Sequence, residues 1–467
     1  MEGLLKLAGE IPKLSSTSSD SHQGSEGLAA TLSSLSSSSS SDRIHVFDRL
    51  SELSSLHMIR QERRAYKSVF VLAGSCQPPY KGKLYEVEIR QGSEGTGGAT
   101  HIAKQPVARF FDQEGLLFSR QAVLHGASIC SPSTPSKLYM LLNNLPMPLG
   151  PPPSMTPDSL KGYVYDTQSM SWGTFRSPKS SKPIGTMIAA YGNLYYLASP
   201  ACLVYEMPSP PFERYDPGAD RWETLPILPS KPVYCEEIVG YAVCCGYILV
   251  SLYGSKGFRF MAFHVTREKW YPVKSEVPRR DRCGYPFRGR AVVVGDSIYA
   301  SSNRYGDVIE FNFNSTTYSV SRPLTLPGLK CHTESVHCDP TRRRTEYFVH
   351  LGGSDFCLVQ TAMESCRSDC QPLWVTTFRI VVASGGGSYI ETLHSTACDV
   401  DIGGASFHIR YSFAKDEECD GVGPVEEENG SASDADAEDY GFSPDEDESN
   451  SEETSGEDDE DDKDYMK

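Results

Sequence analysis

Between residues 65 and 413, short apolar runs alternate with turns that are rich in Gly, Pro and Asp. The runs Val69–Ala73, Lys83–Ile89 and Tyr247–Leu252 contain β-branched and aromatic residues and have the length of ordinary strands. The three-to-four spacing of apolar positions that marks an amphipathic helix disappears in this part of the chain. The pattern therefore predicts an all-β body over residues 65–413.

Aromatic residues recur within this body at a fixed interval. In four places an aromatic residue is followed by a polar one, and a second aromatic stands seven positions after the first. The four pairs are Tyr165 with Trp172, Tyr215 with Trp222, Phe263 with Trp270, and Phe311 with Tyr318. Successive first aromatics are 50, 48 and 48 residues apart. We expect the first aromatic to end a strand, a residue such as Asp216 to form the turn, and the second aromatic to begin the return strand.

A period near 50 residues predicts a repeated small sheet. One such sheet cannot cover both of its faces, so neighbouring sheets must stack and close radially. Strand pairs counted along the chain predict six sheets, with seven as the alternative, and the sixth contains Glu346–Leu351 and Trp374–Val382. The segment Phe407–Phe413 is predicted to pair with the N-terminal strand and close the ring. The Pro-rich stretch 143–160 is predicted to be a loop.

The segment Tyr215–Pro229 reads Tyr-Asp-Pro-x4-Trp-x2-Leu-Pro at its start and resembles a kelch repeat of the galactose-oxidase-type β-propeller. The resemblance extends over residues 65–413 and implies a kelch-type propeller. The Gly-Gly pair of that family is found here at Gly352-Gly353 and is mostly missing elsewhere. The run from Tyr347 to Leu358 is similar to the closing segment of an expanded plant family of propellers of unknown function, some related to F-box proteins. That resemblance implies recognition of substrates for a larger complex.

The two ends of the chain differ from this body. Residues 1–42 are rich in Ser and are predicted to be disordered. Within residues 43–64, apolar positions spaced by three and four follow Asp42 and predict one short amphipathic helix, which would pack on the body or bind a partner. This segment is too short for the three helices of an F-box. Residues 414–467 are predicted to form a disordered acidic tail.

The formal net charge of −17 belongs to the tail. From Asp416 onward there are 24 acidic residues and two Lys, which gives −22 and leaves +5 for residues 1–415, since −17 minus −22 is +5. A body charge of +5 is a weak field and does not favour nucleic-acid binding. The tail would bind basic partners such as histones, or it would only keep the chain soluble. The sequence leaves both alternatives open.

Composition also bears on location. No stretch of about 18 apolar residues is present, so no membrane-spanning helix is expected. The start of the chain lacks the apolar core of a secretory signal, which predicts a cytoplasmic or nuclear protein with reduced thiols. Four of the 14 Cys fall singly in predicted strands and are expected to be small buried hydrophobic residues. They are Cys130, Cys202, Cys235 and Cys357.

We considered whether the sequence contains the ligands of a copper site or of a zinc site. The copper site of the oxidase that shares this fold type needs a Tyr crosslinked to Cys, with His and Tyr ligands, and the 11 His show no suitable arrangement. Zinc would require ligands from Cys331, His332, His337 and Cys338, but no Cys-x2-Cys motif accompanies them. The sequence therefore predicts no metal, no cofactor and no catalytic residues.

Two Arg clusters are the candidate partner-binding residues, and both are expected in loops where successive sheets join. They consist of Arg279, Arg280 and Arg282, and of Arg342, Arg343 and Arg344. Arg side chains bind acidic peptides and phosphates through paired hydrogen bonds, although ordinary solvated loops have the same composition. The leading hypothesis is a non-enzymatic scaffold that binds a protein partner. The alternatives are an acidic accessory protein that binds basic partners through its tail, and an enzyme with a central pocket.

Overall fold

The computed structural model describes much of the chain between residues 66 and 415. The described residues are 66–75, 82–90, 100–102, 106–110, 120–131, 134–146, 160–182, 184–200, 208–229, 236–254, 257–275, 287–302, 307–330, 344–362, 370–401 and 407–415. All belong to the first of two units, Met1–Gly423 and Pro424–Lys467. They form strands and turns, and they include no helix that is long and apolar enough to cross a membrane. The predicted Ser-rich segment, the predicted helix within 43–64, and the acidic tail beyond Lys415 lie outside the described residues.

The described part of the chain is all-β, and its strands form five sheets. For description the strands are divided here into six groups, A to F, in chain order, with the last strand, β26, placed in group A. Group A contains β1 (Tyr66–Ser75), β2 (Gly82–Arg90), β3 (Thr100–Ile102), β4 (Ala108–Phe110) and β26 (Phe407–Ala414). Group B contains β5 (Arg120–Ser131), β6 (Thr134–Pro146), β7 (Leu160–Asp166) and β8 (Ser171–Phe175). Group C contains β9 (Gly185–Ala190), β10 (Asn193–Ala198), β11 (Phe212–Asp216) and β12 (Arg221–Thr224).

The second half of the body follows the same order. Group D contains β13 (Glu237–Cys244), β14 (Tyr247–Gly254), β15 (Gly257–His264) and β16 (Lys269–Ser275). Group E contains β17 (Arg288–Val294), β18 (Ser297–Ser301), β19 (Val308–Asn314), β20 (Ser319–Val320) and β21 (Leu324–Thr325). Group F contains β22 (Arg344–Gly352), β23 (Asp355–Ala362), β24 (Cys370–Val382) and β25 (Ser388–Asp401). Within every group, neighbouring strands are antiparallel.

Groups D and E share one nine-stranded sheet. They are joined by two short parallel pairings, β13 with β17 and β16 with β20, each of which aligns only two residue pairs. Together with the pairing of β18 and β19, these links close a hydrogen-bonded circuit of eight strands. Groups A, B, C and F form separate antiparallel sheets.

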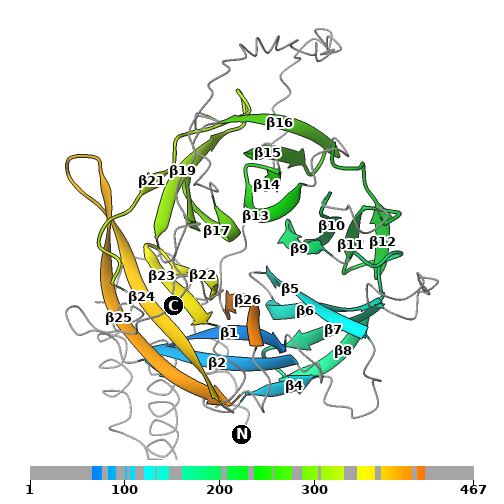
Figure 1. Ribbon diagram of the computed structural model, residues 1–467, viewed down its shortest axis with the longest axis horizontal. Coiled ribbons are helices and arrows are strands. Elements are labelled where there is room, and N and C mark those ends of the chain that lie inside the picture. The colour runs from blue at the N-terminus through cyan, green and yellow to red at the C-terminus, as the bar shows by residue number, and fades with distance from the viewer. Residues whose placement is uncertain are drawn as a thin grey trace, which may run out of the picture. The chain divides into compact units, whose positions relative to one another are not determined.

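One edge strand of each group contacts the corresponding strand of the next group, and these contacts form a closed series. β26 contacts β5, and the contacts continue through β9, β13, β17 and β22 before returning to β26. These strands lie toward the centre of the first unit, and the last strands of the groups lie at its periphery (Figure 1). The antiparallel pairing of β26 with β1 places the end of the body beside its beginning, with Phe70 opposite Phe413. The predicted pairing of Phe407–Phe413 with the N-terminal strand is confirmed.

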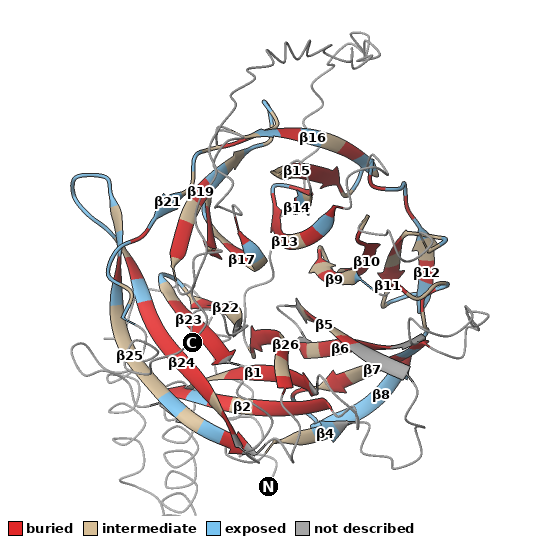
Figure 2. Cartoon of the chain, viewed as in Figure 1, coloured by how far each residue is buried: buried red, intermediate tan, exposed pale blue. Residues whose placement is uncertain are grey.

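The hydrophobic core is divided into clusters that lie between adjacent groups. Six clusters join A with B, B with C, C with D, D with E, E with F, and F with A. Strand β10 shows the cause, because Leu194 and Tyr196 pack toward group B while Tyr195 and Leu197 pack toward group D. Alternate side chains of a strand point to opposite faces, so a group between two neighbours buries both faces. Buried residues accordingly make up most of the middle strands β10 and β14, whereas β9 and β17 also contain half-buried and exposed residues (Figure 2).

Two sequence predictions of local structure require correction. Glu346–Leu351 and Trp374–Val382 lie in group F as expected, but β23 lies between them and pairs with both. Gly352 has a φ of 98°, which only Gly adopts readily, and Gly353 follows at 59°, so that the two residues turn the chain back into β23. The predicted loop 143–160 is also too long, because β6 continues to Pro146 opposite Arg120 of the long strand β5.

Candidate functional site

Three of the four aromatic pairs face each other across the outer hairpin of their group. Tyr165 lies opposite Trp172 in group B, and Tyr215 lies opposite Trp222 in group C. Group D has the same arrangement with Phe263 and Trp270. The ring centroids within each pair are separated by 4.6, 5.2 and 5.0 Å, respectively. The seven-residue spacing therefore sets the register of these hairpins.

The polar residue after the first aromatic holds the turn. Asp216 Oδ1 accepts the backbone N–H groups of Gly218 and Ala219 at 2.8 and 3.2 Å. Asp166 accepts the corresponding two N–H groups in group B, and these hydrogen bonds hold the pKa of its carboxyl below the usual range. Asp side chains commonly stabilise turns in this way. The structure thus places Asp216 in the turn position expected from the sequence.

The fourth pair has a different register. The expectation that Phe311 ends its strand and Tyr318 begins the return strand was wrong, because β19 continues to Asn314 and β20 begins at Ser319. Phe313 lies opposite Val320, and the side chain of Asn314 accepts two N–H groups of the turn at 2.9 Å. Tyr318 is itself a turn residue, with a φ of 47°. Phe311 and Phe313 are both aromatic and lie two positions apart, and Val320 occupies the position that Trp takes in the other groups. The aromatic spacing therefore indicated a register that is shifted by two residues.

The Trp side chains also connect neighbouring groups. Trp222 Nε1 donates a hydrogen bond of 2.6 Å to the carbonyl oxygen of Arg176, which follows the last strand of group B. Trp270 Nε1 donates one of 3.0 Å to the carbonyl oxygen of Pro226, which follows the last strand of group C. Both Trp residues are 7% exposed, whereas Trp172 is 42% exposed. Each buried indole therefore joins its own group to the exit segment of the preceding one.

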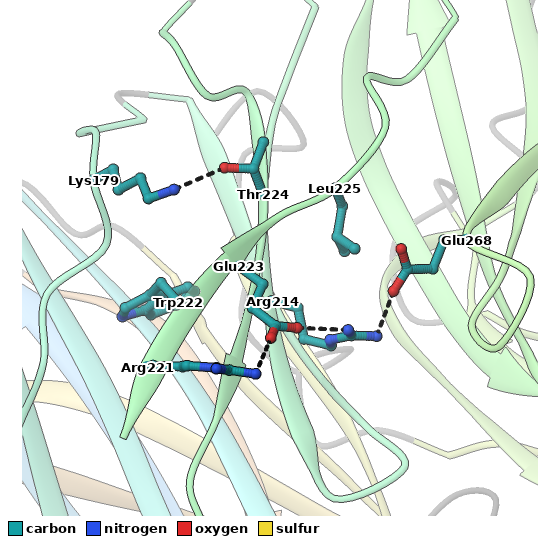
Figure 3. A pocket seen from close by; sticks show the side chains of 8 residues that line it. All are labelled: Lys179, Arg214, Arg221, Trp222, Glu223, Thr224, Leu225 and Glu268. Carbon is teal, nitrogen blue, oxygen red and sulfur yellow. Dashed lines mark hydrogen bonds and ion pairs between the residues drawn. The ribbon is translucent and has the colours of Figure 1, made fainter. Parts of the chain in front are cut away.

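An open hollow of about 490 Å³ lies at the outer strand of group C, partly bordered by group D. Its lining combines charges of both signs with two apolar side chains (Figure 3). The lining residues are Lys179, Arg214, Arg221, Trp222, Glu223, Thr224, Leu225 and Glu268. Because β12 ends the hydrogen-bonded order of its sheet, the hollow lies at a sheet edge.

Strand alternation sends Arg214 toward this hollow. Phe212 packs against group D, whereas Tyr215 packs against group B, so Arg214 shares the face of Phe212. Arg214 lies opposite Glu223 in the β11–β12 hairpin, and its guanidinium contacts the Glu223 carboxylate at 2.7 Å. It also contacts Glu268 of group D at 2.9 Å. Arg214 therefore bridges two groups (Figure 3).

Glu268 reaches this position from the turn between β15 and β16. It stands five residues after Phe263 and has a φ of 50°, and Asp220 holds the same place after Tyr215 with a φ of 46°. In group C the Tyr215 hydroxyl donates to Asp220 Oδ1 at 2.7 Å. Phe263 has no hydroxyl, and the carboxylate of Glu268 contacts a neighbouring group instead.

The remaining contacts order the rim of the hollow. Arg221 contacts Glu223 at 2.5 Å, and Lys179 Nζ donates to Thr224 Oγ1 at 3.0 Å. The hydrogen bond from Arg214, together with the charges of both Arg residues, holds the pKa of Glu223 below its usual range. The hollow therefore presents fixed charged and hydrogen-bonding groups beside the apolar Leu225.

The sequence-predicted Arg clusters are not part of this hollow. Arg279, Arg280, Arg282, Arg342 and Arg343 lie outside the described residues. Arg344 begins β22, and its side chain lies outside the described ones. The role given to these six residues stays a prediction.

The metal candidates can be followed only in part. Cys331, His332, His337 and Cys338 lie outside the described residues. Across the residues that the structure does describe, His, Cys, Asp and Glu form no group of three that could hold a metal ion. Cys357 is fully buried, as predicted, and burial raises the pKa of its thiol. Cys130, Cys202 and Cys235 have no described side chains.

The sequence analysis did not identify Arg214, Glu223 or Glu268. The contact between Arg214 and Glu223 could have been found, because the pairing of Tyr215 with Trp222 places their outer neighbours opposite each other. The contact with Glu268 has no local signal, since it depends on how two groups pack.

Residues 155–394 match the family described as "Protein of unknown function (DUF1668)". The matched span contains the hollow and all four aromatic hairpins. No curated protein matches the chain. Because the match covers just over half of the 467 residues, the chain belongs to the DUF1668 family, whose function is unknown.

Proposed function

We propose that the chain is a kelch-type propeller of six blades and that it serves as a non-enzymatic scaffold for binding another protein. The six inter-group hydrophobic clusters are the observation that carries this proposal. Each group buries both faces against neighbours, which is how small sheets are stabilised in a radial array. In this arrangement groups A to F are the blades, and β26 closes the ring within group A.

The count of six is supported by the cluster between groups F and A, where Val349 and Val375 pack with Val69 and Val71. A seventh blade would need a place between these two groups. The eight-strand circuit through groups D and E fits the same proposal. It depends on two parallel pairings of two residue pairs each, whereas the antiparallel pairing of β14 with β15 aligns eight pairs.

The hollow at β12 is the proposed binding surface. Arg and Trp side chains are enriched among the residues that dominate binding energy at protein interfaces, and this hollow contains Arg214, Arg221 and Trp222. Carboxylates from Glu223 and Glu268 hold Arg214 in place before a partner arrives. Preordered side chains lose less entropy on binding. The proposed partner is a protein segment with polar and charged side chains.

The enzyme alternative required acids or His converging on the centre from several groups. Where β5, β17 and β26 approach one another, the Tyr411 hydroxyl contacts Ser128 Oγ at 3.0 Å and Arg290 Nη1 at 3.4 Å. The two hydroxyls and the guanidinium do not form an acid–base pair of the kind that hydrolytic enzymes use. We prefer the scaffold proposal because of the inter-group clusters and the charged hollow, and we propose that the protein acts in the cytoplasm or nucleus without a cofactor.

The acidic tail supports a second candidate, a carrier of an acidic arm that binds basic proteins such as histones. Its support is the charge of −22 from Asp416 onward. The proposed partner is a protein in both cases.

A charge reversal in the hollow tests the proposed binding surface. A full-length bait carrying Arg221→Glu would be compared with the wild-type bait. The control bait carries Lys161→Glu, since Lys161 is an exposed residue of β7. Each bait would be used for capture from a plant extract, and the captured proteins would be quantified by mass spectrometry. We expect the R221E bait to recover at least tenfold less of the specific partners than wild type, and the K161E bait to recover as much as wild type. Equal recovery by all three baits would show that the hollow is not the binding surface.

A further inference from the structure

The hollow at β12 follows the free edge of a sheet. β12 is the last strand in the order β12-β11-β10-β9, so only one of its two edges is paired within the sheet. Trp222 packs in the cluster between groups B and C, and Leu225 packs in the cluster between groups C and D, yet both side chains line the hollow. A hollow that touches both faces of a terminal strand lies along the unpaired edge of that strand.

The main-chain hydrogen bonds between β11 and β12 show which groups of β12 are already paired. The N–H of Leu225, directly after β12, donates to the carbonyl oxygen of Phe212 at 3.0 Å. Hydrogen-bonded and non-bonded residue pairs alternate along an antiparallel ladder, so the next bonded pair is Arg214 with Glu223. The main-chain N–H and C=O groups of Glu223 therefore point toward β11.

The main-chain groups of Trp222 and Thr224 point away from β11, because these two residues occupy the non-bonded positions of the ladder. Within the described part of the chain, no hydrogen bond reaches the main-chain N–H or C=O of either residue. The two residues stand two positions apart, which is the spacing at which a further strand would form its hydrogen bonds. Such an edge is a template for a strand from another chain.

The charges beside this edge indicate the chemistry of the added strand. The lining of the hollow contains three cationic and two acidic side chains, so one positive charge is in excess. Both Arg side chains contact carboxylates. For Lys179, the described residues provide the hydroxyl of Thr224 at 3.0 Å and no carboxylate. Lys179 therefore supplies the excess charge, on the face of β12 to which Thr224 belongs.

We propose that an extended segment of the partner adds to the four-stranded sheet of group C as a fifth strand beside β12, and that an acidic side chain of this segment binds Lys179. The inference rests on the proposed function, because it specifies how the hollow binds a protein. Main-chain hydrogen bonds to Trp222 and Thr224 provide affinity. The side chains of the added strand alternate between the two faces of the sheet, and the acidic one lies on the face of Lys179.

Selected peptides represent the partner in the test. Random peptides of about eight residues, which is within the usual length of a strand, are selected by phage display on the full-length protein. The affinity of the best peptide is measured by fluorescence anisotropy, and Arg221→Glu should weaken its binding. Each amide of this peptide is then N-methylated in turn, which removes one hydrogen-bond donor. We expect a loss of about tenfold in affinity at alternate positions and little change at the positions between them.

Two proline variants test the same hydrogen bonds from the side of the protein. Thr224→Pro removes an N–H that faces the open edge, a position where sheets tolerate Pro, and leaves the ladder with β11 intact. Thr174→Pro is the matched control, because exposed Thr174 follows Trp172 in the edge strand β8 as Thr224 follows Trp222. We expect T224P to weaken peptide binding about tenfold and T174P to bind as wild type. Circular dichroism checks that both variants are folded.

The acidic side chain is tested through Lys179. Replacing the acid of the peptide by its amide should weaken binding to wild type about threefold and should have no effect on binding to Lys179→Met. Equal effects of the amide on both proteins would show that the acid does not bind Lys179.

The outcomes separate this inference from the proposed function. Peptides that require Arg221 but tolerate every N-methyl group, and that bind T224P as tightly as wild type, would overturn strand addition and leave the hollow as the binding surface. Peptides that bind R221E as tightly as wild type, or a selection that yields no binding peptide, would contradict the proposed function itself.

Discussion

The Nζ of Lys182 lies 2.5 Å from Oε2 of Glu213, and both side chains have no exposed surface. Lys182 belongs to the segment that connects groups B and C, and Glu213 lies on β11. The Lys182 ammonium also lies 4.4 Å from the centre of the Tyr196 ring. Burial lowers the pKa of Lys182, and Glu213 opposes this effect. The ion pair fastens the connection between the two groups inside the protein.

We expect Lys182→Met to lower the free energy of unfolding by about 3–5 kcal/mol, because it leaves the carboxylate of Glu213 buried without its partner. The double variant K182M/E213L should recover part of this loss. Removing the exposed partner in Arg379→Ala should cost about 1 kcal/mol or less, since Arg379 is 45% exposed in its contact with Asp355. Urea unfolding followed by circular dichroism measures all three. A loss for K182M no larger than that for R379A would contradict this account.

The indole hydrogen bonds make a separate prediction. Trp222→Phe keeps an aromatic ring in the cluster between groups B and C but removes the donor to the Arg176 carbonyl. We expect a loss of about 1–2 kcal/mol in unfolding free energy. Trp172→Phe is the matched control, because Trp172 holds the equivalent position in group B and is 42% exposed. Equal losses in thermal or urea unfolding would show that the indole hydrogen bond does not stabilise the junction.

Because His125 has a lowered pKa, we expect it to make the free energy of unfolding depend on pH. Burial, with smaller contributions from Arg410 and Lys182, lowers the pKa of His125 to about 3 from an ordinary value of 6.5. The unfolded chain therefore binds a proton between these values that the folded chain does not. The contribution of neutral His125 to the free energy of unfolding should be fully present above about pH 6.5 and should be lost progressively as the pH falls toward 3.

His125→Phe keeps a ring beside Tyr196, which lies 5.5 Å away between centroids, and removes the titrating group. The decrease in unfolding free energy between pH 7.5 and pH 5 should be smaller in H125F than in wild type. Identical pH profiles for the two proteins would mean that His125 is not held neutral by the fold.

The sequence predicted those features that depend on neighbours along the chain. Strand alternation and hairpin spacing identified the strands and paired Tyr215 with Trp222, because both are set within about ten residues. The pairing of Phe407–Phe413 with the N-terminal strand also followed, since a closed series of sheets has only one free edge at each end. Where Val320 takes the place of Trp, the same spacing rule selected Tyr318 and failed.

The sequence could not predict the side-chain contacts between groups. Arg214 meets Glu268 only because two hairpins of different groups pack side by side, and no spacing in the chain encodes that distance. The sequence placed Cys357 in a strand but did not predict that this strand, β23, lies between Glu346–Leu351 and Trp374–Val382, because the turn at Gly352-Gly353 was taken for a family signature and not for a reversal of the chain. The Arg clusters remain a prediction, since the described residues do not include their side chains.

The most direct test of the scaffold proposal compares two baits, the full-length chain and residues 1–415, which retain every described residue. Both would be used for capture from a cell extract, with partners quantified by mass spectrometry. If the folded body binds the partner, both baits should recover the same proteins in similar amounts. If the recovered proteins are basic and disappear with residues 416–467, the body is not the binding surface and the scaffold proposal is wrong.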